Sequence, residues 1–169
     1  MTALDISSEA LKVAAQNVRA YGLTRRIRLL RSDLFGVFGK SEKGRWDMIV
    51  SNPPYIPSRS LAGLDAEVRR EPRLALDGGK TGLDLIFSLL DRAPFFLNRG
   101  GWLVLEIGHR QKKPIAKKLA RGSFKNFEFI EDLAGIPRIL VACHCERPKG
   151  AKQSMLTEIA SSSLRSFSQ

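Results

Sequence analysis

Ser51-Asn52-Pro53-Pro54-Tyr55-Ile56-Pro57 follows residues 46–50, a short, largely apolar run with the length and composition of a buried strand. The two consecutive prolines can continue neither a strand nor a helix, so the strand must end at Asn52. Because Asn52 precedes a proline, its backbone is pushed towards extended geometry, which restricts where its amide can point. The sequence therefore predicts a rigid loop at the carboxyl end of a strand.

The composition of this loop favours the binding of a planar –NH2 group. Neither proline has an N–H, so the loop is rich in carbonyl acceptors and poor in competing donors. We expect the Asn52 side-chain oxygen and the Pro53 carbonyl to accept hydrogen bonds from such a group, with Tyr55 packed alongside. The alternative is a plain turn at the end of a strand, which Asn-Pro and Pro-Pro also mark.

Length and composition predict one globular domain followed by a tail. The chain has 169 residues, of which 43% are hydrophobic, which is enough for a real core. No apolar run approaches the roughly 18 residues of a membrane span, and the first residues lack the pattern of a secretory signal. We expect a partial catalytic domain over residues 1–145 and a polar, flexible tail over residues 146–169.

The two cysteines, Cys143 and Cys145, flank His144 in a predicted late strand. These residues offer too few ligands for a metal ion, so we expect buried or half-buried strand residues and no metal site. Low cysteine use is consistent with a reducing compartment. We therefore predict a cytoplasmic protein that does not contact a membrane.

The net charge of +11 points to anionic surroundings. A strongly basic surface attracts polyanions such as RNA, and we expect proximity to RNA or the ribosome. A solvated surface that keeps the protein soluble explains any single basic cluster equally well. The clusters are Arg25, Arg26, Arg28 and Arg31; Arg69, Arg70 and Arg73; and Arg110, Lys112, Lys113, Lys117, Lys118 and Arg121.

Strand and helix patterns alternate along the chain, with strands predicted at residues 2–6, 27–30, 46–51, 102–107, 124–131 and 136–145, and helices at 9–21, 82–96 and 111–121. Residues 53–80 form a long irregular segment, which in a compact domain is usually functional. The alternation predicts an α/β fold with a mostly parallel sheet and helices on both faces. The last two strands have no helix between them, and we expect an antiparallel hairpin at one edge.

Three polar residues stand at the carboxyl ends of predicted strands, where open α/β sheets bind their ligands. Asp5 closes the early strand and is a candidate acceptor for the two ribose hydroxyls, or alternatively a helix cap. Asp33, with Leu34 beside it, is a candidate adenine site or a turn residue. Asn52 is the third. Their order resembles class I methyltransferases, in which a ribose acid and an adenine-side acid precede Asn-Pro-Pro-Tyr.

The resemblance becomes specific over residues 2–142, where the motifs are similar to those of the release factor glutamine methyltransferase family (HemK-like). The matching motifs are Val50-Ser51-Asn52-Pro53-Pro54-Tyr55-Ile56-Pro57, Glu71-Pro72-Arg73-Leu74-Ala75-Leu76-Asp77-Gly78-Gly79, Gly82-Leu83-Asp84, Leu105-Glu106-Ile107-Gly108-His109 and Asp132-Leu133-Ala134-Gly135-Ile136-Pro137-Arg138. The second motif separates this family from nucleic-acid amino methyltransferases, which share only the catalytic loop.

The resemblance implies methyl transfer from S-adenosylmethionine to the glutamine side chain in the Gly-Gly-Gln loop of peptide chain release factors. Its catalytic loop corresponds to Asn52, Pro53, Pro54 and Tyr55, and its cofactor site to Asp5, Asp33, Leu34 and Asn52. Two acceptors holding the –NH2 hydrogens would favour a pyramidal nitrogen in the transition state. The remaining rate would come from positioning, with no strong general base required.

Two features of the family have no counterpart in this sequence. A Gly-rich turn normally follows a central first strand ahead of the ribose acid, yet Asp5 has only four residues before it. The family's N-terminal helical domain is also absent. The chain thus resembles an N-terminally truncated member, and we expect weak or no cofactor binding by it alone. The alternatives are a non-catalytic remnant or binding module of the same fold and a nucleic-acid amino-group methyltransferase.

Overall fold

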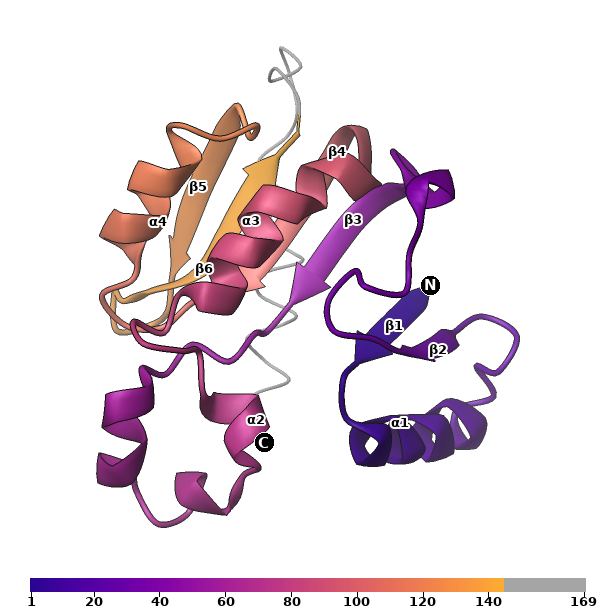
Figure 1. Ribbon diagram of the computed structural model, residues 1–169, viewed down its shortest axis with the longest axis horizontal. Coiled ribbons are helices and arrows are strands. Elements are labelled where there is room, and N and C mark those ends of the chain that lie inside the picture. The colour runs from indigo at the N-terminus through magenta and orange to yellow at the C-terminus, as the bar shows by residue number, and fades with distance from the viewer. Residues whose placement is uncertain (145–169) are drawn as a thin grey trace. The chain divides into compact units, whose positions relative to one another are not determined.

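The computed structural model describes residues 1–144, which fall into two compact units (Figure 1). The first unit is Met1–Lys43, and the second is Gly44–Gln169, of which the structure describes residues 44–144. Each unit contains its own hydrogen-bonded sheet. The predicted tail and Cys145 lie outside the described residues, whereas Cys143 is buried at the end of the last strand.

The first unit is a parallel strand pair with a connecting helix. Strand β1 (Thr2–Asp5) and strand β2 (Arg28–Arg31) pair in parallel, with Asp5 opposite Arg31. Helix α1 (Ser8–Ala20) lies between them in sequence. The Ser7 side chain caps its first turn by accepting a hydrogen bond from the Ala10 N–H at 3.2 Å, which satisfies one of the free donors there. These elements confirm the strand–helix–strand prediction.

Few residues of the first unit are buried. Helix α1 contains no buried residue, and the Val13 side chain is 57% exposed. The unit's buried residues are Phe35 and Ser32, both in the loop that follows β2. A short 3-10 helix, Lys40–Glu42, closes the unit. Little apolar surface is removed from water here, so burial contributes little stability to this unit.

The second unit is built on a four-stranded sheet in the order β3-β4-β6-β5. Its strands are β3 (Trp46–Ser51), β4 (Leu97–Glu106), β5 (Asn126–Glu131) and β6 (Pro137–Cys143). Strands β3 and β4 are parallel, and β6 is antiparallel to both β4 and β5. Three strands therefore run one way and β6 runs the other. This arrangement confirms the mostly parallel sheet with an antiparallel hairpin at its edge.

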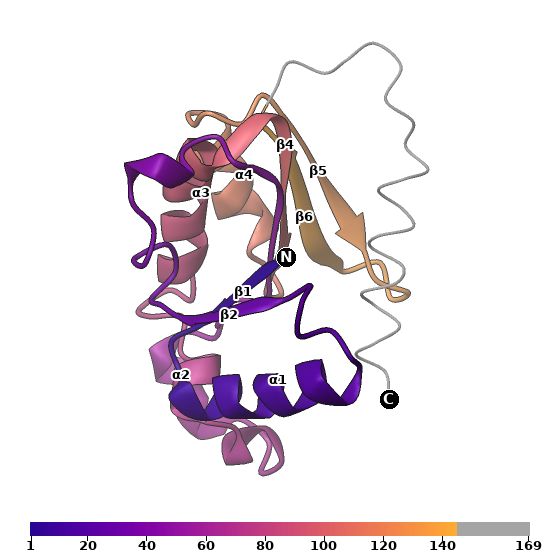
Figure 2. The ribbon, with the colours of Figure 1, turned by 90° about the vertical axis from the view of Figure 1, so that its right-hand side faces the viewer.

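Helices α3 (Asp84–Phe96) and α4 (Lys112–Leu119) pack on the same face of this sheet (Figure 2). Within the described part of this unit, the two helices thus cover one face of the sheet. Between these helices and the sheet lies the main core, and the side chains that are fully buried there include Ile86, Leu103, Leu105, Ile115 and Leu140. A second cluster of Val104, Ile139 and Val141 packs with Trp102 and Ile130.

Two segments of this unit depart from the sequence prediction. Residues 97–101, which precede the predicted strand at 102–107, belong to β4, and this strand begins directly after α3. The β3–β4 register shifts there, and Gly100 adopts a φ of +94° that a glycine accommodates without strain. The long segment 53–80 contains short helical turns, namely the 3-10 helices Ser58–Gly63 and Val68–Arg70 and helix α2 (Arg73–Leu76). No helix within residues 1–144 has the length and apolar character needed to cross a membrane.

Candidate active site

The predicted loop lies beyond the carboxyl end of β3, where Ser51 makes the last strand pair with Leu105 of β4. Asn52 is exposed, and its side chain makes no hydrogen bond to any described residue. Pro53 is buried, yet its carbonyl oxygen accepts no hydrogen bond within residues 1–144. Two acceptors at neighbouring positions are thus left without a hydrogen-bond partner among the described residues.

Tyr55 is fixed at both its hydroxyl and its backbone. Its hydroxyl donates to the Glu106 carboxylate at the end of β4, with an oxygen–oxygen distance of 3.1 Å. Burial and the adjacent Glu106 carboxylate raise the pKa of Tyr55 above its ordinary value, so the hydroxyl keeps its proton at neutral pH. The Tyr55 side chain is consequently held in one place and stays uncharged.

The Gln111 side chain holds the loop in place through hydrogen bonds, a role that the sequence analysis did not predict. Its buried side-chain nitrogen donates to the Tyr55 carbonyl at 3.0 Å and to the Gly82 carbonyl at 2.9 Å. Its side-chain oxygen accepts from the Gly108 N–H at 2.8 Å. A glutamine among basic residues at the start of a helix looks like a surface residue, and only its place three residues after Gly108 could have drawn attention to it.

Two glycines let the chain pass close to the loop. A Cβ atom added to Gly78 would lie 2.7 Å from the Pro54 carbonyl oxygen and 2.8 Å from the Tyr55 Cα atom. A Cβ atom on Gly82, which has a φ of +76°, would overlap the Tyr55 carbonyl oxygen. Both contacts involve backbone atoms, so a side chain at either position would displace the loop.

Residues 71–79, which carry much of the family resemblance, strap the downstream end of the loop. The Ile56 N–H donates to the Leu76 carbonyl at 3.1 Å, and the Gly78 N–H donates to the Ile56 carbonyl at 2.9 Å. These two bonds form a short parallel bridge between Ile56 and Asp77. Because the strap comes from a different part of the chain, it fixes the direction in which the loop leaves the site.

The Asp77 carboxylate organises this strap. One oxygen accepts from the Ser58 hydroxyl at 2.6 Å and the Gly79 N–H at 3.0 Å. The other accepts two hydrogen bonds from the Arg73 guanidinium, at 3.0 and 3.1 Å. The hydrogen bonds from Ser58, Gly79 and Arg73 lower the pKa of Asp77. The carboxylate is therefore charged at neutral pH and ties three neighbours together.

The acids predicted to bind the cofactor lie together at the carboxyl ends of β1 and β2 in the first unit. The Ser32 N–H donates to the Asp5 carbonyl at 2.9 Å, which sets Asp33 just beyond the same edge. One Asp5 carboxylate oxygen accepts from the Ser7 N–H at 2.7 Å, whereas the N-cap of α1 is Ser7 and not Asp5. The Asp33 carboxylate is exposed and makes no hydrogen bond in the described part of the chain. Leu34 has a φ of +46°, an unusual conformation for a leucine.

These positions fit the adenosine part of a nucleoside cofactor. Asp5 retains one carboxylate oxygen with no partner among the described residues, and Asp33 retains both, so hydroxyl or amino donors can bind there. Residues 1–144 contain no group of three or more His, Cys, Asp or Glu side chains that could hold a metal ion.

Comparison with known proteins identifies the relatives of this chain, although no protein-family model matches it. The release factor glutamine methyltransferase of Moorella thermoacetica is 46% identical over 143 residues, which are 83% of this chain and 49% of the relative. The ribosomal protein uL3 glutamine methyltransferase of Bordetella pertussis is 47% identical over 109 residues, 64% of this chain and 36% of the relative. The chain is a homologue of the glutamine methyltransferases.

This glutamine methyltransferase homologue spans about half the length of the curated release factor enzymes that it matches. The enzyme from Thermosynechococcus vestitus, 42% identical over 142 residues, is covered to 48% by the chain. The solved structures agree on the fold. A methyltransferase from Pyrococcus furiosus superposes with a TM-score of 0.59 at 22% identity, over 86% of this chain and 62% of that one. The N-terminal domain of human METTL16 in complex with SAH gives a TM-score of 0.55 at 16% identity, over 86% and 52%.

Proposed function

We propose that the chain serves S-adenosylmethionine-dependent methylation of a glutamine side-chain nitrogen in a protein of the translation machinery. The observation that carries the proposal is the contrast within the loop. The Asn52 side chain and the Pro53 carbonyl are free acceptors, while Tyr55 beside them is fixed by Glu106 and Gln111. A fixed loop with two free acceptors is suited to hold one –NH2 group in one orientation.

Hydrogen bonds to both hydrogens of the amide –NH2 group would accelerate methyl transfer. An amide nitrogen is a poor nucleophile because its lone pair is delocalised into the carbonyl. Hydrogen bonds from its two hydrogens to Asn52 and Pro53 favour the pyramidal nitrogen of the transition state over the planar ground state. Tyr55 is neutral and half-buried, so it packs against the amide plane without adding charge. Positioning by these residues replaces a strong general base.

S-adenosylmethionine, when bound, supplies the methyl group as an activated sulfonium substituent. Among this chain's own residues, Asp5 would accept the ribose hydroxyls through its free carboxylate oxygen. Asp33 and Leu34 would bind the adenine, the first as an acceptor and the second as an apolar contact. Asn52 lies at the carboxyl end of β3, where ligands of open α/β sheets bind.

The first candidate substrate is the glutamine of the Gly-Gly-Gln loop of a peptide chain release factor. Several curated relatives carry the name release factor glutamine methyltransferase, and they align over up to 83% of this chain. Ribosomal protein uL3 is the second candidate, because other relatives at 47% identity are named for it. Both substrates present the same chemical group, so the loop geometry is compatible with either.

Methyl transfer from labelled S-adenosylmethionine at millimolar concentration tests the proposal. Purified release factor, uL3 and total RNA serve as parallel acceptors, and mass spectrometry locates the label. We expect label on a glutamine side-chain nitrogen of one protein acceptor. Asn52→Ala should lower the rate about 100-fold, the effect of removing one preorganised partner in other active sites. Asn17→Ala, an exposed asparagine on α1, is the matched control and should leave the rate unchanged.

The distribution of label decides between the alternatives. Label on the release factor or on uL3 assigns the substrate, whereas label on RNA alone supports a nucleic-acid amino-group methyltransferase. If no acceptor is labelled by a chain that circular dichroism shows to be folded, the chain is a non-catalytic remnant or binding module. In that case the proposal is wrong.

A further inference from the structure

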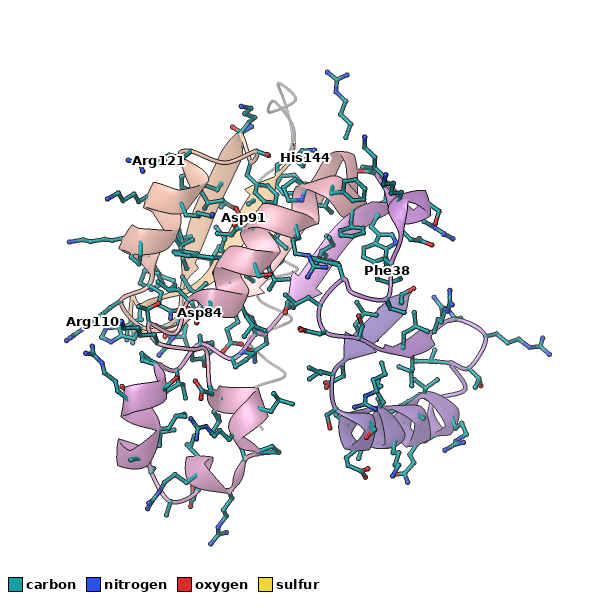
Figure 3. All side chains as sticks on the ribbon, in the orientation of Figure 1. Phe38, Asp84, Asp91, Arg110, Arg121 and His144 are labelled. Atoms are coloured by element: carbon teal, nitrogen blue, oxygen red, sulfur yellow. The ribbon has the colours of Figure 1, made fainter. Side chains whose placement is uncertain are left out.

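One side of α4 and its flanking turns carries a row of cations. Arg110, Lys113, Lys117 and Arg121 are exposed. Lys113 and Lys117 are four residues apart and so lie on one side of α4, and Arg110 and Arg121 lie in the turns just before and just after the helix. The buried residues of the helix, Ile115 and Leu119, face the sheet. Figure 3 labels Arg110 and Arg121, which lie at opposite ends of α4. The row therefore runs along the whole length of the helix.

This row is not neutralised by acidic neighbours. Two other lysines of α4 do have partners, since Lys118 contacts Asp91 at 2.7 Å and Lys112 lies 3.8 Å from Glu131. The four residues of the row make no ion pair or hydrogen bond through their side chains within residues 1–144. Lys113 and Lys117 are four residues apart within α4, a spacing at which like charges repel each other. The helix thus keeps an unfavourable charge pattern that an anionic partner would relieve.

A hollow of about 450 Å³ lies at the start of the row. Four basic residues line it from the β4–α4 connection and from α4 itself, and the turn between β5 and β6 completes it. The lining residues are His109, Arg110, Lys112, Lys113, Gly135, Ile136 and Pro137. Its walls combine basic side chains with the apolar side chains of Ile136 and Pro137, which suits a phosphate group attached to an organic group.

Aromatic side chains border the same helix on the edge strand β5. Phe127 and Phe129 are two residues apart, so they project from the same face of the strand, and their rings meet edge to face at 6.0 Å. The Lys112 ammonium lies 5.7 Å from the centre of the Phe129 ring, which places the pair beside α4. Phe127 is 39% exposed, so its ring is accessible to a planar ligand.

We propose that the α4 surface, defined as Arg110, Lys113, Lys117, Arg121 and Phe127, binds single-stranded RNA. Cations along the helix would contact the phosphates, while the Phe127 ring would stack on a base, the combination that single-stranded nucleic-acid sites use. An acidic protein would satisfy the cations but would leave the exposed ring without a role. The inference goes beyond the proposed methyl transfer and does not depend on it, because binding is measured without cofactor or turnover.

Fluorescence anisotropy of a labelled single-stranded RNA of about 12 nucleotides, titrated with the full chain at several salt concentrations, tests the proposal. K113E/K117E/R121E should lower the affinity at least 100-fold. It should also reduce the slope of log K against log salt by about 2, since each lost phosphate contact in a single strand removes about 0.7. The control R19E/R25E/R26E makes the same change in net charge at exposed arginines of the first unit and should change the affinity less than threefold.

A second variant separates RNA from an acidic protein as the partner. Phe127→Leu keeps an apolar side chain but removes the stacking surface, so RNA affinity should fall about fivefold or more. Binding of poly-glutamate by the same variant should not change. Equal losses of RNA affinity in the two triple variants would mean that only net charge determines binding. An unchanged RNA affinity of Phe127→Leu would point to an acidic protein as the partner. Either result overturns the proposal. If K113E/K117E/R121E does not fold, K113Q/K117Q replaces it, with a loss of about tenfold expected and no loss contradicting the proposal.

Discussion

The two units of the chain differ in how much structure supports their predicted ligand residues. In the second unit, Leu103 and Leu105 of β4 are completely buried, and α3 and α4 cover one face of the sheet (Figure 2). In the first unit, α1 buries none of its residues. The acceptor loop is therefore supported by a buried core, whereas the two acids proposed to bind the cofactor are not, although the same sequence pattern, a polar residue at a strand end, marks all of them.

The two units therefore differ in how firmly their candidate ligand-binding residues are oriented before a ligand binds. The loop from Asn52 to Tyr55 is held by Glu106 and Gln111, so its acceptors are oriented before any ligand arrives. Asp5 and Asp33 stand on a strand pair with few buried apolar contacts, the type of region that opens locally at low free-energy cost. A ligand that binds those acids would also stabilise the first unit, by mass action on its folded form.

The largest expected effect is on the free energy of unfolding, and it is measured by substituting one core residue of the second unit and one helix residue of the first. Leu105→Ala removes a completely buried side chain and should lower the free energy of unfolding by about 2–5 kcal/mol. Val13→Ala removes methyl groups from an exposed position and should change it by less than about 0.5 kcal/mol. Urea denaturation measures both. Equal losses would show that the two units share one core.

Hydrogen exchange should resolve the same difference residue by residue. Amides of β4 and β6 lie in the centre of the four-stranded sheet and should exchange only through global unfolding. Amides of α1 and β2 should exchange through local openings that cost at least about 2 kcal/mol less, which is a rate roughly 30-fold higher. Equal protection of amides in both units would contradict the conclusion that the first unit is locally less stable than the second.

The anchor of the loop provides a third test. Gln111→Leu leaves the Tyr55 and Gly82 carbonyls and the Gly108 N–H without their buried partner. We expect a loss of about 1–3 kcal/mol in unfolding free energy. We also expect a fall in the methyl-transfer rate at saturating substrate, because the acceptors lose their orientation. Gln16→Leu, at an exposed position of α1, is the matched control. A rate unchanged from the native chain would exclude a positioning role for Gln111.

The smallest effect concerns pH and the strap over the loop. Hydrogen bonds from Ser58, Gly79 and Arg73 lower the pKa of Asp77. A lowered pKa in the folded state stabilises the fold above the unfolded-state pKa of about 4, and this contribution is lost as the pH falls through the folded-state pKa. Asp77→Asn should therefore lower the melting temperature at pH 7, and the difference should shrink below pH 4. Asp65→Asn, in the same segment, should have no such effect, and a pH-independent gap for Asp77→Asn would contradict the assignment.

The sequence predicted the order of elements and the loop because those depend on local chemistry. Apolar periodicity located β3, β4 and α3, and two prolines fixed where β3 ends. The role of Gln111 could not be predicted in the same way, since its three partners come from distant parts of the chain. Neither could the bulge that extends β4 back to Leu97, because it depends on the pairing with β3. Long-range hydrogen bonding decided both.

The central claim is that Asn52 and Pro53 grip the two hydrogens of a glutamine amide. It is tested most directly by nuclear magnetic resonance of a Gly-Gly-Gln peptide labelled with ¹⁵N in its glutamine side chain, titrated with the chain in the absence of cofactor. We predict that both side-chain amide protons shift on binding, and that Asn52→Ala abolishes the shifts while Asn17→Ala preserves them. Shifts that survive Asn52→Ala, or amide protons that do not respond to the folded chain, would contradict the claim.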